Sequence, residues 1–363
     1  MKRLGIDARL IGQTGVGVYI QNLLYHLPIY LPSDCEVYIF TLNGEVDKSI
    51  KNEKYHFVKA DYKWHTVSEQ VSFLSLLNRS DLDLMHFTYL SYPFLYKKTF
   101  MSTIHDLTHL KYRSGKASTK NNLHYQIKYL AYKYVLSTQV KNSCEIIVPT
   151  NTIKKQIINS FGSQYGDKIH TVYEGVNINL TSAKTNKELG EKFDGDFLIY
   201  VGNFYPHKNI QSLIHAFKRA RGSLKLILIG PQDYFAKRIK ELIIELKLEK
   251  RVIIFHGASL SDLRFFYENA KGLVHPSLSE GFCLPLSEAV YFNLPIVASN
   301  IPVFQEVLGD NYLPFDPNSI DSITKGIEEF ISKEKKINYE DLRSKYSFKE
   351  MAHDTAKLYK SYL

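Results

Sequence analysis

The chain has 363 residues, of which 44% are hydrophobic and 23% charged, and its formal net charge is +9. This composition excludes a largely disordered chain, and the length exceeds one ordinary hydrophobic core, so two domains are expected. Three widely spaced cysteines exclude a disulfide framework. No apolar run approaches the roughly 20 residues of a membrane-spanning helix, and no signal peptide is recognisable. We therefore expect a cytoplasmic protein.

The positive charge is concentrated in the first half of the chain. Residues 1–185 carry 22 Lys and Arg against 14 Asp and Glu, which leaves 24 against 23 for the remainder. Between residues 107 and 166 the only acidic side chain is Glu145. This asymmetry predicts an anionic partner for the first half. Because no nucleic-acid-binding module is recognisable, we expect a peripheral contact with an anionic membrane and none with nucleic acid.

Short apolar runs alternate with longer helical patterns throughout the chain. In the first half, strands are expected at residues 4–7, 37–41, 84–87, 101–104 and 145–149, with helices at 17–27, 120–141 and 152–161. In the second half, strands are expected at residues 197–202, 224–230, 252–256, 272–275 and 294–298, with helices at 209–221, 236–246, 260–270 and 285–292. Such alternation predicts parallel sheets with right-handed crossover connections.

A polar segment at residues 177–194 marks the boundary between the two halves. We predict an α/β fold of two doubly wound, Rossmann-like domains, residues 1–180 and 181–345, that face each other across a ligand cleft. Residues 346–363 have the pattern of an amphipathic helix. Ligands of such sheets bind beyond the carboxyl ends of the strands, so polar residues at those ends are the site candidates.

The predicted helix at residues 120–141 interleaves lysines with Tyr and Leu at helical spacing. A basic helix with aromatic side chains can lie on an anionic membrane. The alternative is an ordinary helix of a Rossmann-like domain, with its apolar side packed and its lysines in water. Both interpretations fit the sequence equally well.

Two carboxylates, Glu280 and Glu288, follow the predicted strand at residues 272–275. Pro285 suits the first turn of the helix that contains Glu288. The N–H groups at such a helix start favour a phosphate, and carboxylates accept hydrogen bonds from sugar or ribose hydroxyls. This arrangement predicts a site for a phosphorylated, sugar-like ligand. The alternative is an exposed Glu288 and a Glu280 that only complements the helix dipole.

Two loops that follow predicted strands are candidates for anion binding. Gly15 and Gly17 can let backbone amides approach an anion, or they can simply form a tight turn. This loop lacks the lysine of a P-loop and the third glycine of the dinucleotide fingerprint, which argues against a dehydrogenase. The second loop contains Gly202, Asn203 and Lys208. The Lys208 ammonium can meet a pyrophosphate, or it can be a solvated surface charge.

His105 and Asp106 follow the predicted strand at residues 101–104. A histidine at a strand end can bind a substrate hydroxyl or take part in proton transfer, although a structural hydrogen bond is the commoner role. His109 lies nearby, but no carboxylate or cysteine cluster completes a metal-ligand set. We therefore predict no metal site.

In this order, the motifs resemble those of the retaining glycosyltransferases of family 4, which have the GT-B fold. The two glutamates separated by seven residues are the specific signal, and the match is closest to the bacterial mannosyltransferase-like members that build surface polysaccharides. The motifs that carry the resemblance lie at residues 14–19, 104–107, 148–151, 173–177, 201–202, 206–209, 275–277, 280–282 and 288.

The resemblance implies a role for each part of the chain. Residues 1–180 would form the acceptor-side domain, residues 181–345 the nucleotide-sugar-binding domain, and residues 346–363 a helix that crosses back to the first domain. The donor would be a nucleoside-diphosphate hexose, with GDP-mannose favoured, and no cofactor or metal would be needed. The acceptor would be a glycan or a lipid-linked oligosaccharide at the inner face of the plasma membrane.

The resemblance also implies the roles of individual residues. Lys208 would neutralise the pyrophosphate and Glu288 would bind the ribose. Glu280 would hold the transferred sugar, and His105 would contact it from the first domain. The remaining donor-binding residues would be Gly15, Gly17, Asn203, Gly281, Phe282, Cys283 and Leu284.

One position departs from the family pattern. Many members have an arginine where this chain has Asn203, so one positive charge on the pyrophosphate is missing. Two other functions stay open at this point. One is a nucleotide-sugar epimerase of the GT-B type, and the other is a nucleotide-sugar-binding protein without turnover.

Overall fold

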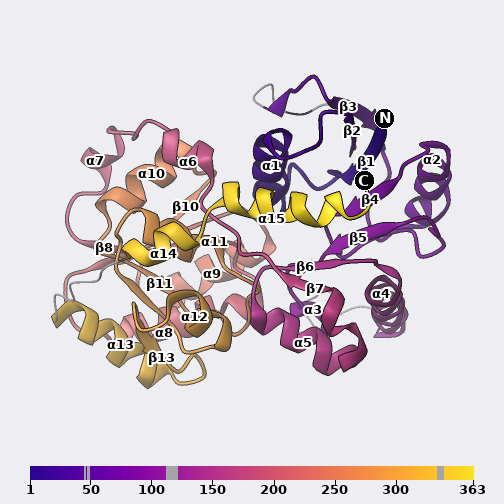
Figure 1. Ribbon diagram of the computed structural model, residues 1–363. Coiled ribbons are helices and arrows are strands. Elements are labelled where there is room, and N and C mark those ends of the chain that lie inside the picture. The colour runs from indigo at the N-terminus through magenta and orange to yellow at the C-terminus, as the bar shows by residue number, and fades with distance from the viewer. Residues whose placement is uncertain (45, 47–49, 112–121, 333–338) are drawn as a thin grey trace. The chain divides into compact units, whose positions relative to one another are not determined.

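The computed structural model describes residues 1–44, 46, 50–111, 122–332 and 339–363, and it divides the chain into two compact units (Figure 1). Unit 1 comprises Met1–Glu174 and Ser347–Leu363, and unit 2 comprises Gly175–Tyr346. The first change of unit therefore follows Glu174, whereas the sequence predicted a boundary after residue 180.

Unit 1 contains a parallel sheet of seven strands among its described residues, in the order β3-β2-β1-β4-β5-β6-β7. The strands are β1 (Lys2–Asp7), β2 (Cys35–Thr41), β3 (Tyr55–Lys59), β4 (Leu84–Phe87), β5 (Phe100–Thr103), β6 (Ile146–Val148) and β7 (Ile169–Thr171). The α-helices are α1 (Val16–His26), α2 (Leu74–Arg79), α3 (Thr108–Lys111), α4 (Asn122–Asn142), α5 (Asn151–Phe161) and α15 (Phe348–Lys360). The shorter helices are η1 (Leu27–Ile29), the π-helical turn η3 (Glu69–Phe73) and η5 (Ser163–Lys168).

Unit 2 repeats this arrangement with six parallel strands among its described residues, in the order β10-β9-β8-β11-β12-β13. The strands are β8 (Phe197–Val201), β9 (Lys225–Gly230), β10 (Val252–His256), β11 (Gly272–His275), β12 (Ile296–Ser299) and β13 (Leu313–Phe315). The helices are α6 (Ile178–Ser182), α7 (Leu189–Lys192), η6 (Pro206–Lys208), α8 (Ile210–Arg219), α9 (Tyr234–Glu245), α10 (Leu260–Asn269), α11 (Leu284–Tyr291), α12 (Pro302–Leu308), α13 (Ile320–Ser332) and α14 (Glu340–Lys345).

The predicted α/β class with two Rossmann-like sheets is confirmed. The sequence did not predict the helices α2, α12 and α13, and the strands that it did not predict all lie at sheet ends. β3, β7 and β13 lie at the ends of their sheets. An edge strand pairs on one side only and is partly exposed, so it lacks the continuous apolar run of a central strand. β3 shows this directly, because only its first residue, Tyr55, is buried.

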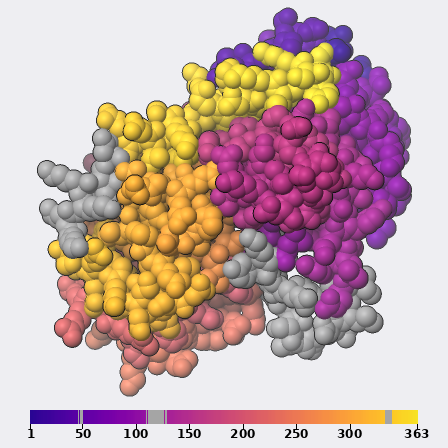
Figure 2. All heavy atoms as spheres, turned by 60° about the horizontal axis from the view of Figure 1, so that its bottom comes forward, coloured from indigo at the N-terminus to yellow at the C-terminus, as the bar shows by residue number. Residues whose placement is uncertain are grey.

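The C-terminal helix α15 belongs to unit 1, where it packs on α1. Ser347 begins the helix by accepting hydrogen bonds from the N–H groups of Lys349 and Glu350. Figure 2 shows the C-terminal residues, in yellow, lying against the purple atoms of unit 1. Met351 and Tyr359, which the pattern placed on the apolar side, are fully buried. No helix within the described ranges has the length and apolar character needed to cross a membrane.

A buried ionic cluster lies at the end of β1 in unit 1. The Arg9 guanidinium is fully buried and donates to both carboxylate oxygens of Asp7, at 2.9 and 2.7 Å, and to Glu69 Oε1 at 2.8 Å. It also donates to the carbonyl of Tyr62 and lies 3.9 Å from the ring centroid of Phe73. The cluster therefore fastens the segment of residues 62–73 to the end of the central strand.

Replacing Arg9 should destabilise unit 1 strongly, because Arg9→Met leaves two buried carboxylates without a cation. We expect the free energy of unfolding to fall by about 3–5 kcal/mol. Urea unfolding followed by tryptophan fluorescence measures this, since the single tryptophan, Trp64, lies in unit 1. The control is Arg3→Met, which breaks the exposed pair with Asp81 and should cost under about 1 kcal/mol. Equal losses in the two variants would contradict a structural role for the cluster.

Candidate functional site

The candidate site of unit 2 lies at the carboxyl ends of β8 and β11. These two strands are neighbours at the point where the strand order reverses, which is where ligands bind in open parallel sheets. The loop after β8 ends in Lys208, and the loop after β11 contains Glu280. A backbone hydrogen bond from Leu278 to the His207 carbonyl, at 2.8 Å, joins the two loops. Their side chains are therefore held next to one another.

The local backbone after β8 places Lys208 at the end of a short helical turn. Gly202 has a φ of 146°, and a Cβ there would lie 2.8 Å from the Tyr200 hydroxyl, so only glycine fits. The Tyr200 hydroxyl donates to the Asn203 carbonyl at 2.6 Å, which fixes the bend. Asn203 accepts a weak bond from the Tyr205 N–H with its side chain. The turn η6 then ends at Lys208, and α8 begins after Asn209.

Lys208 and Glu280 form a largely buried ion pair. The Lys208 ammonium donates to both carboxylate oxygens, at 2.6 and 2.8 Å. Burial by itself would raise the pKa of Glu280, but the charge of Lys208 outweighs burial and lowers this pKa to about 2. The carboxylate is therefore ionised at physiological pH, and a cation is in place at the strand ends.

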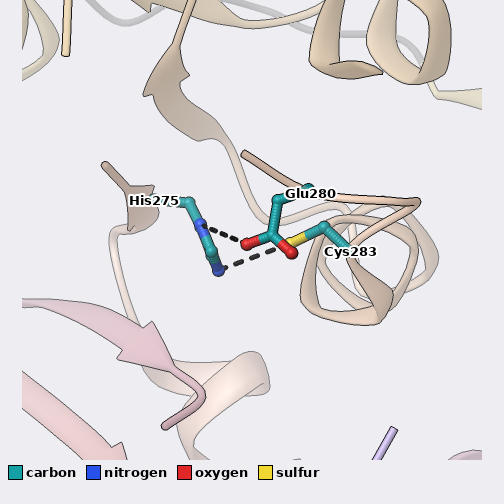
Figure 3. A group of neighbouring side chains, drawn as sticks. All are labelled: His275, Glu280 and Cys283. Carbon is teal, nitrogen blue, oxygen red and sulfur yellow. Dashed lines mark hydrogen bonds and ion pairs between the residues drawn. The ribbon is translucent and has the colours of Figure 1, made fainter. Parts of the chain in front are cut away.

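Three further side chains complete the surroundings of this pair. Ser277 donates to Glu280 Oε1 at 2.6 Å and lies 3.2 Å from His275 Nδ1. The other ring nitrogen of His275 lies 3.4 Å from the Cys283 sulfur. Figure 3 shows His275, Glu280 and Cys283 pointing toward one another. Burial lowers the pKa of His275 to about 4, so its imidazole is neutral.

An imidazole, a thiol and a carboxylate are a donor set that zinc accepts. The ligand atoms of His275, Glu280 and Cys283 lie within 4.8 Å of one another. However, Glu280 already accepts two hydrogen bonds from Lys208 and one from Ser277. A metal would have to displace a buried ammonium, so hydrogen bonding accounts for the cluster better than metal ligation does.

Glu288 lies in α11, which begins at Leu284 after a left-handed Cys283 with a φ of 79°. Glu288 is buried, and its Oε2 accepts a hydrogen bond from the Tyr267 hydroxyl at 2.6 Å. Burial raises the pKa of Glu288 to about 7, against an ordinary value of 4.5. The pKa values of the two glutamates are therefore pushed in opposite directions, which supports separate roles.

The glycine loop of unit 1 joins β1 to α1. Gly15 caps the helix with a φ of 68° and has open space around it. A Cβ on Gly17 would lie 2.6 Å from the Ile11 carbonyl, so this position needs glycine for close packing. Gly15 therefore borders free space, whereas Gly17 has a structural reason to be glycine.

His105 follows β5 in unit 1 and is held at both ring nitrogens. Its Nδ1 lies 2.9 Å from Glu174 Oε1, and its Nε2 lies 3.0 Å from the Thr88 carbonyl. Burial alone would lower the pKa of His105, but the hydrogen bond and charge of Glu174 raise it above its usual value. Since both partners are acceptors, this geometry suits a doubly protonated imidazolium.

The structure thus brings Lys208 and Glu280 into direct contact and places Asn203, Glu288 and the loop of residues 281–284 in unit 2. Phe282 in that loop packs edge-on against Tyr346. Gly15, Gly17 and His105 lie in unit 1. Sequence reasoning gave no role to the partners of these residues. Ser277 and Glu174 lie within the motifs at residues 275–277 and 173–177, which is a local signal, whereas Tyr267 lies outside every motif and gives none.

Two family models match the chain. The model for Glycosyltransferase Family 4 matches residues 13–180, and the model for glycosyl transferases group 1 matches residues 182–347. Together they span most of both units.

Individual relatives agree with these models. The O-antigen chain mannosyltransferase RfbU of Salmonella typhimurium is 29% identical over 269 residues, which cover 73% of this chain and 70% of that protein. The uncharacterised glycosyltransferase MJ1178 of Methanocaldococcus jannaschii is 24% identical over 95% of this chain and 94% of its own. Among solved structures, a sucrose-phosphate synthase from Thermosynechococcus elongatus superposes with a TM-score of 0.80 at 17% identity, covering 99% of both chains.

The raised pKa of Glu288 predicts a pH-dependent stability. Between pH 4.5 and about 7 the folded chain keeps the Glu288 proton that the unfolded chain has lost. This contribution is therefore fully present below pH 4.5 and is lost as the pH rises through 7. The side chain introduced by Glu288→Gln cannot ionise, so it avoids the cost of a buried charge. The variant should therefore gain stability relative to the unaltered protein as the pH rises from 5 to 8. One pKa unit corresponds to about 1.4 kcal/mol.

Chemical denaturation at several pH values measures this difference. The control is Glu249→Gln, which alters an exposed carboxylate of unit 2. A stability difference that stays flat with pH for Glu288→Gln would show that Glu288 has an ordinary pKa.

Proposed function

Because the chain belongs to the glycosyltransferases of family 4 and group 1, we propose that it transfers a hexose from a nucleoside diphosphate to an acceptor hydroxyl with retention of configuration. The observation that supports this most strongly is the buried pair of Lys208 and Glu280 at the carboxyl ends of β8 and β11. A cation at this position suits a diphosphate, and a carboxylate beside it suits a sugar hydroxyl.

Unit 2 holds the donor in this proposal. The Lys208 ammonium shares its hydrogen bonds between Glu280 and the pyrophosphate. The N–H groups at the start of α11 also stabilise the negative charge of the pyrophosphate. Glu288 accepts hydrogen bonds from the ribose hydroxyls, with its other oxygen held by Tyr267. GDP-mannose is the favoured donor because RfbU is named as a mannosyltransferase. The same relative suggests surface polysaccharide synthesis as the pathway.

Glu280 and the backbone of residues 281–284 hold the transferred sugar. His105, together with Gly15 and Gly17, serves the sugar and acceptor from unit 1. Both N–H groups of His105 already have acceptors, so a sugar hydroxyl would share the bond now made to the Thr88 carbonyl. The Glu174 carboxylate keeps the ring charged and oriented while this happens.

The chemical step separates charge, since the leaving diphosphate gains negative charge as the sugar becomes cation-like. Lys208 is preorganised for the first change, and ionised Glu280 faces the second. The acceptor attacks from the same face that the diphosphate leaves, and the departing phosphate takes the acceptor proton. Lys208 supplies the charge that a divalent metal would otherwise provide, so the reaction needs no metal.

We also propose that the acceptor is lipid-linked and that unit 1 meets an anionic membrane at its cytoplasmic side. Three segments of unit 1 carry apolar side chains that are each more than half exposed: Val67, Val71, Leu95, Leu130 and Tyr134. The three segments adjoin one another, because Gln70 binds the backbone of Tyr92 and Phe94 and the Phe94 ring contacts Tyr134.

The same three segments carry exposed lysines: Lys63, Lys97 and Lys133. Apolar side chains surrounded by lysines suit anionic headgroups. Lys120, which begins the predicted basic helix, lies outside the described residues.

Replacing the ion pair should slow transfer strongly. Glu280→Gln keeps the shape and the contact with Ser277 but removes the charge, and the double variant Lys208→Met with Glu280→Gln leaves no unpaired buried charge. We expect both to lower kcat for GDP-mannose with an octyl mannoside acceptor by about 10²–10³-fold. Product analysis by mass spectrometry and NMR gives the rate and the anomeric configuration.

The matched control is Lys218→Met, an exposed lysine on the neighbouring α8, which should keep full activity. Retained activity in a folded double variant would refute the assignment. An inverted product would refute retention, and conversion of the donor without an acceptor would favour an epimerase.

The membrane contact predicts the behaviour of patch variants in liposome flotation. Val67→Ser combined with Leu130→Ser should lower recovery with vesicles that contain anionic lipid by about tenfold, since each change removes an apolar side chain from the bilayer interface. The control is Ile244→Ser, an apolar residue on α9 of unit 2 that is also about half exposed. Equal recovery with neutral and anionic vesicles, or an equal loss in the control, would contradict the proposal.

A further inference from the structure

Unit 1 contains a buried line of hydrogen bonds that runs from the C-terminal helix to the strand before His105. The Tyr359 hydroxyl on α15 lies 2.6 Å from His86 Nδ1 on β4. The other ring nitrogen of His86 lies 2.8 Å from the Thr103 hydroxyl, which lies 3.0 Å from the Tyr19 hydroxyl on α1. All four side chains are at most 1% exposed.

This line can be fully hydrogen-bonded with a neutral His86. Burial lowers the pKa of His86 to about 3, so its ring is neutral and carries one N–H. A neutral imidazole donates at one nitrogen and accepts at the other, and hydroxyl groups on both sides can match either tautomer. Removing one hydroxyl therefore leaves a buried ring nitrogen unsatisfied and disturbs the bonds on the other side.

Two features connect this line of hydrogen bonds to His105. Thr103 is the last residue of β5, two positions before His105, so its hydroxyl fixes the strand end from which His105 emerges. The Tyr19 ring lies edge-on to the His105 ring, with centroids 4.8 Å apart and planes at 82°. Tyr19 thus supports the side of a ring whose nitrogens are held by Glu174 and the Thr88 carbonyl.

Stability alone gives little reason for this line. Phenylalanine at the two tyrosine positions, valine at Thr103 and an apolar residue at His86 would fill the same space without these buried polar groups, and such replacements of whole networks are often neutral or stabilising. A fully satisfied polar network instead fixes one arrangement of its side chains. The network therefore serves to fix the orientation of side chains, and the side chain at the end of the network is His105.

We propose that Tyr359, His86, Thr103 and Tyr19 are positioning residues for His105, so that the C-terminal helix supports the active site. This rests on the proposed function in one respect, namely that His105 contacts the transferred sugar. The residues do not touch substrate. They hold the His105 ring at the angle at which it keeps its bond to Glu174.

The test removes one hydroxyl at the far end of the line. Tyr359→Phe should lower kcat with GDP-mannose and octyl mannoside by about tenfold and leave the KM for the donor within about twofold, since misplacement costs rate rather than donor binding. Thr103→Val, which breaks the line in its middle, should behave alike. The matched control is Tyr362→Phe, the same change three residues later, where the hydroxyl donates to Glu145 instead.

A readout without substrate is the NMR titration of the His105 ring nitrogens in 15N-histidine-labelled protein, assigned by loss of the signal in His105→Asn. Among the described residues, the charged and titratable groups around this ring are Glu174, Asp106, His86 and Tyr19. Tyr359→Phe should lower the titration midpoint of His105 by at least about 0.3 pH units, because a less constrained ring loses part of its bond to Glu174. Tyr362→Phe should leave it unchanged.

The double variant separates positioning from a general loss of structure. In the His105→Asn background, Tyr359→Phe should cause no further loss of kcat, since its effect passes through His105. An equal tenfold loss in both backgrounds, or an unchanged His105 midpoint, would overturn the proposal. Full activity of His105→Asn alone would overturn the role of His105 in the proposed function, and the NMR midpoint would still decide whether Tyr359 holds the ring.

Discussion

The buried ion pair between Lys208 and Glu280 is the interaction on which the rest of the candidate site depends. Two charges taken out of water are costly unless their remaining hydrogen-bonding capacity is met. Here the ammonium binds both carboxylate oxygens and Ser277 binds one of them. The bend at Gly202 and the bond between the two loops bring the partners together. A diphosphate that enters this site meets a cation that is already oriented, and its binding competes with Glu280 for Lys208.

In both units the candidate site residues lie near the point where the strand order of the parallel sheet reverses. In each sheet the chain order reverses between two central strands, and the site residues of unit 2 follow these strands. In unit 1 the glycine loop follows β1, and His105 follows β5, one strand beyond the reversal. Buried polar groups support both sites: Tyr267 behind Glu288, and Glu174 with the line from Tyr359 behind His105.

The sequence predicted those parts of the structure that depend on residues close together along the chain. Central strands are continuous apolar runs, so they were found, whereas the edge strands β3, β7 and β13 are partly exposed or short and were missed. Lys208, Glu280 and Glu288 stand in loops and helix starts with a local pattern. The contacts of Tyr267 with Glu288 and of Glu174 with His105 depend on long-range packing that no local pattern encodes. The sequence also gave no sign that Lys208 is already paired, which changes how a diphosphate must bind.

We propose that the end of β8 and the start of α11 in unit 2 bind a nucleoside diphosphate. The decisive experiment is a crystal structure of the chain with GDP. We expect a phosphate oxygen within hydrogen-bond distance of the Lys208 ammonium, with the ribose hydroxyls on Glu288. GDP bound elsewhere, with the Lys208–Glu280 pair undisturbed and Glu288 contacting only Tyr267, would contradict it.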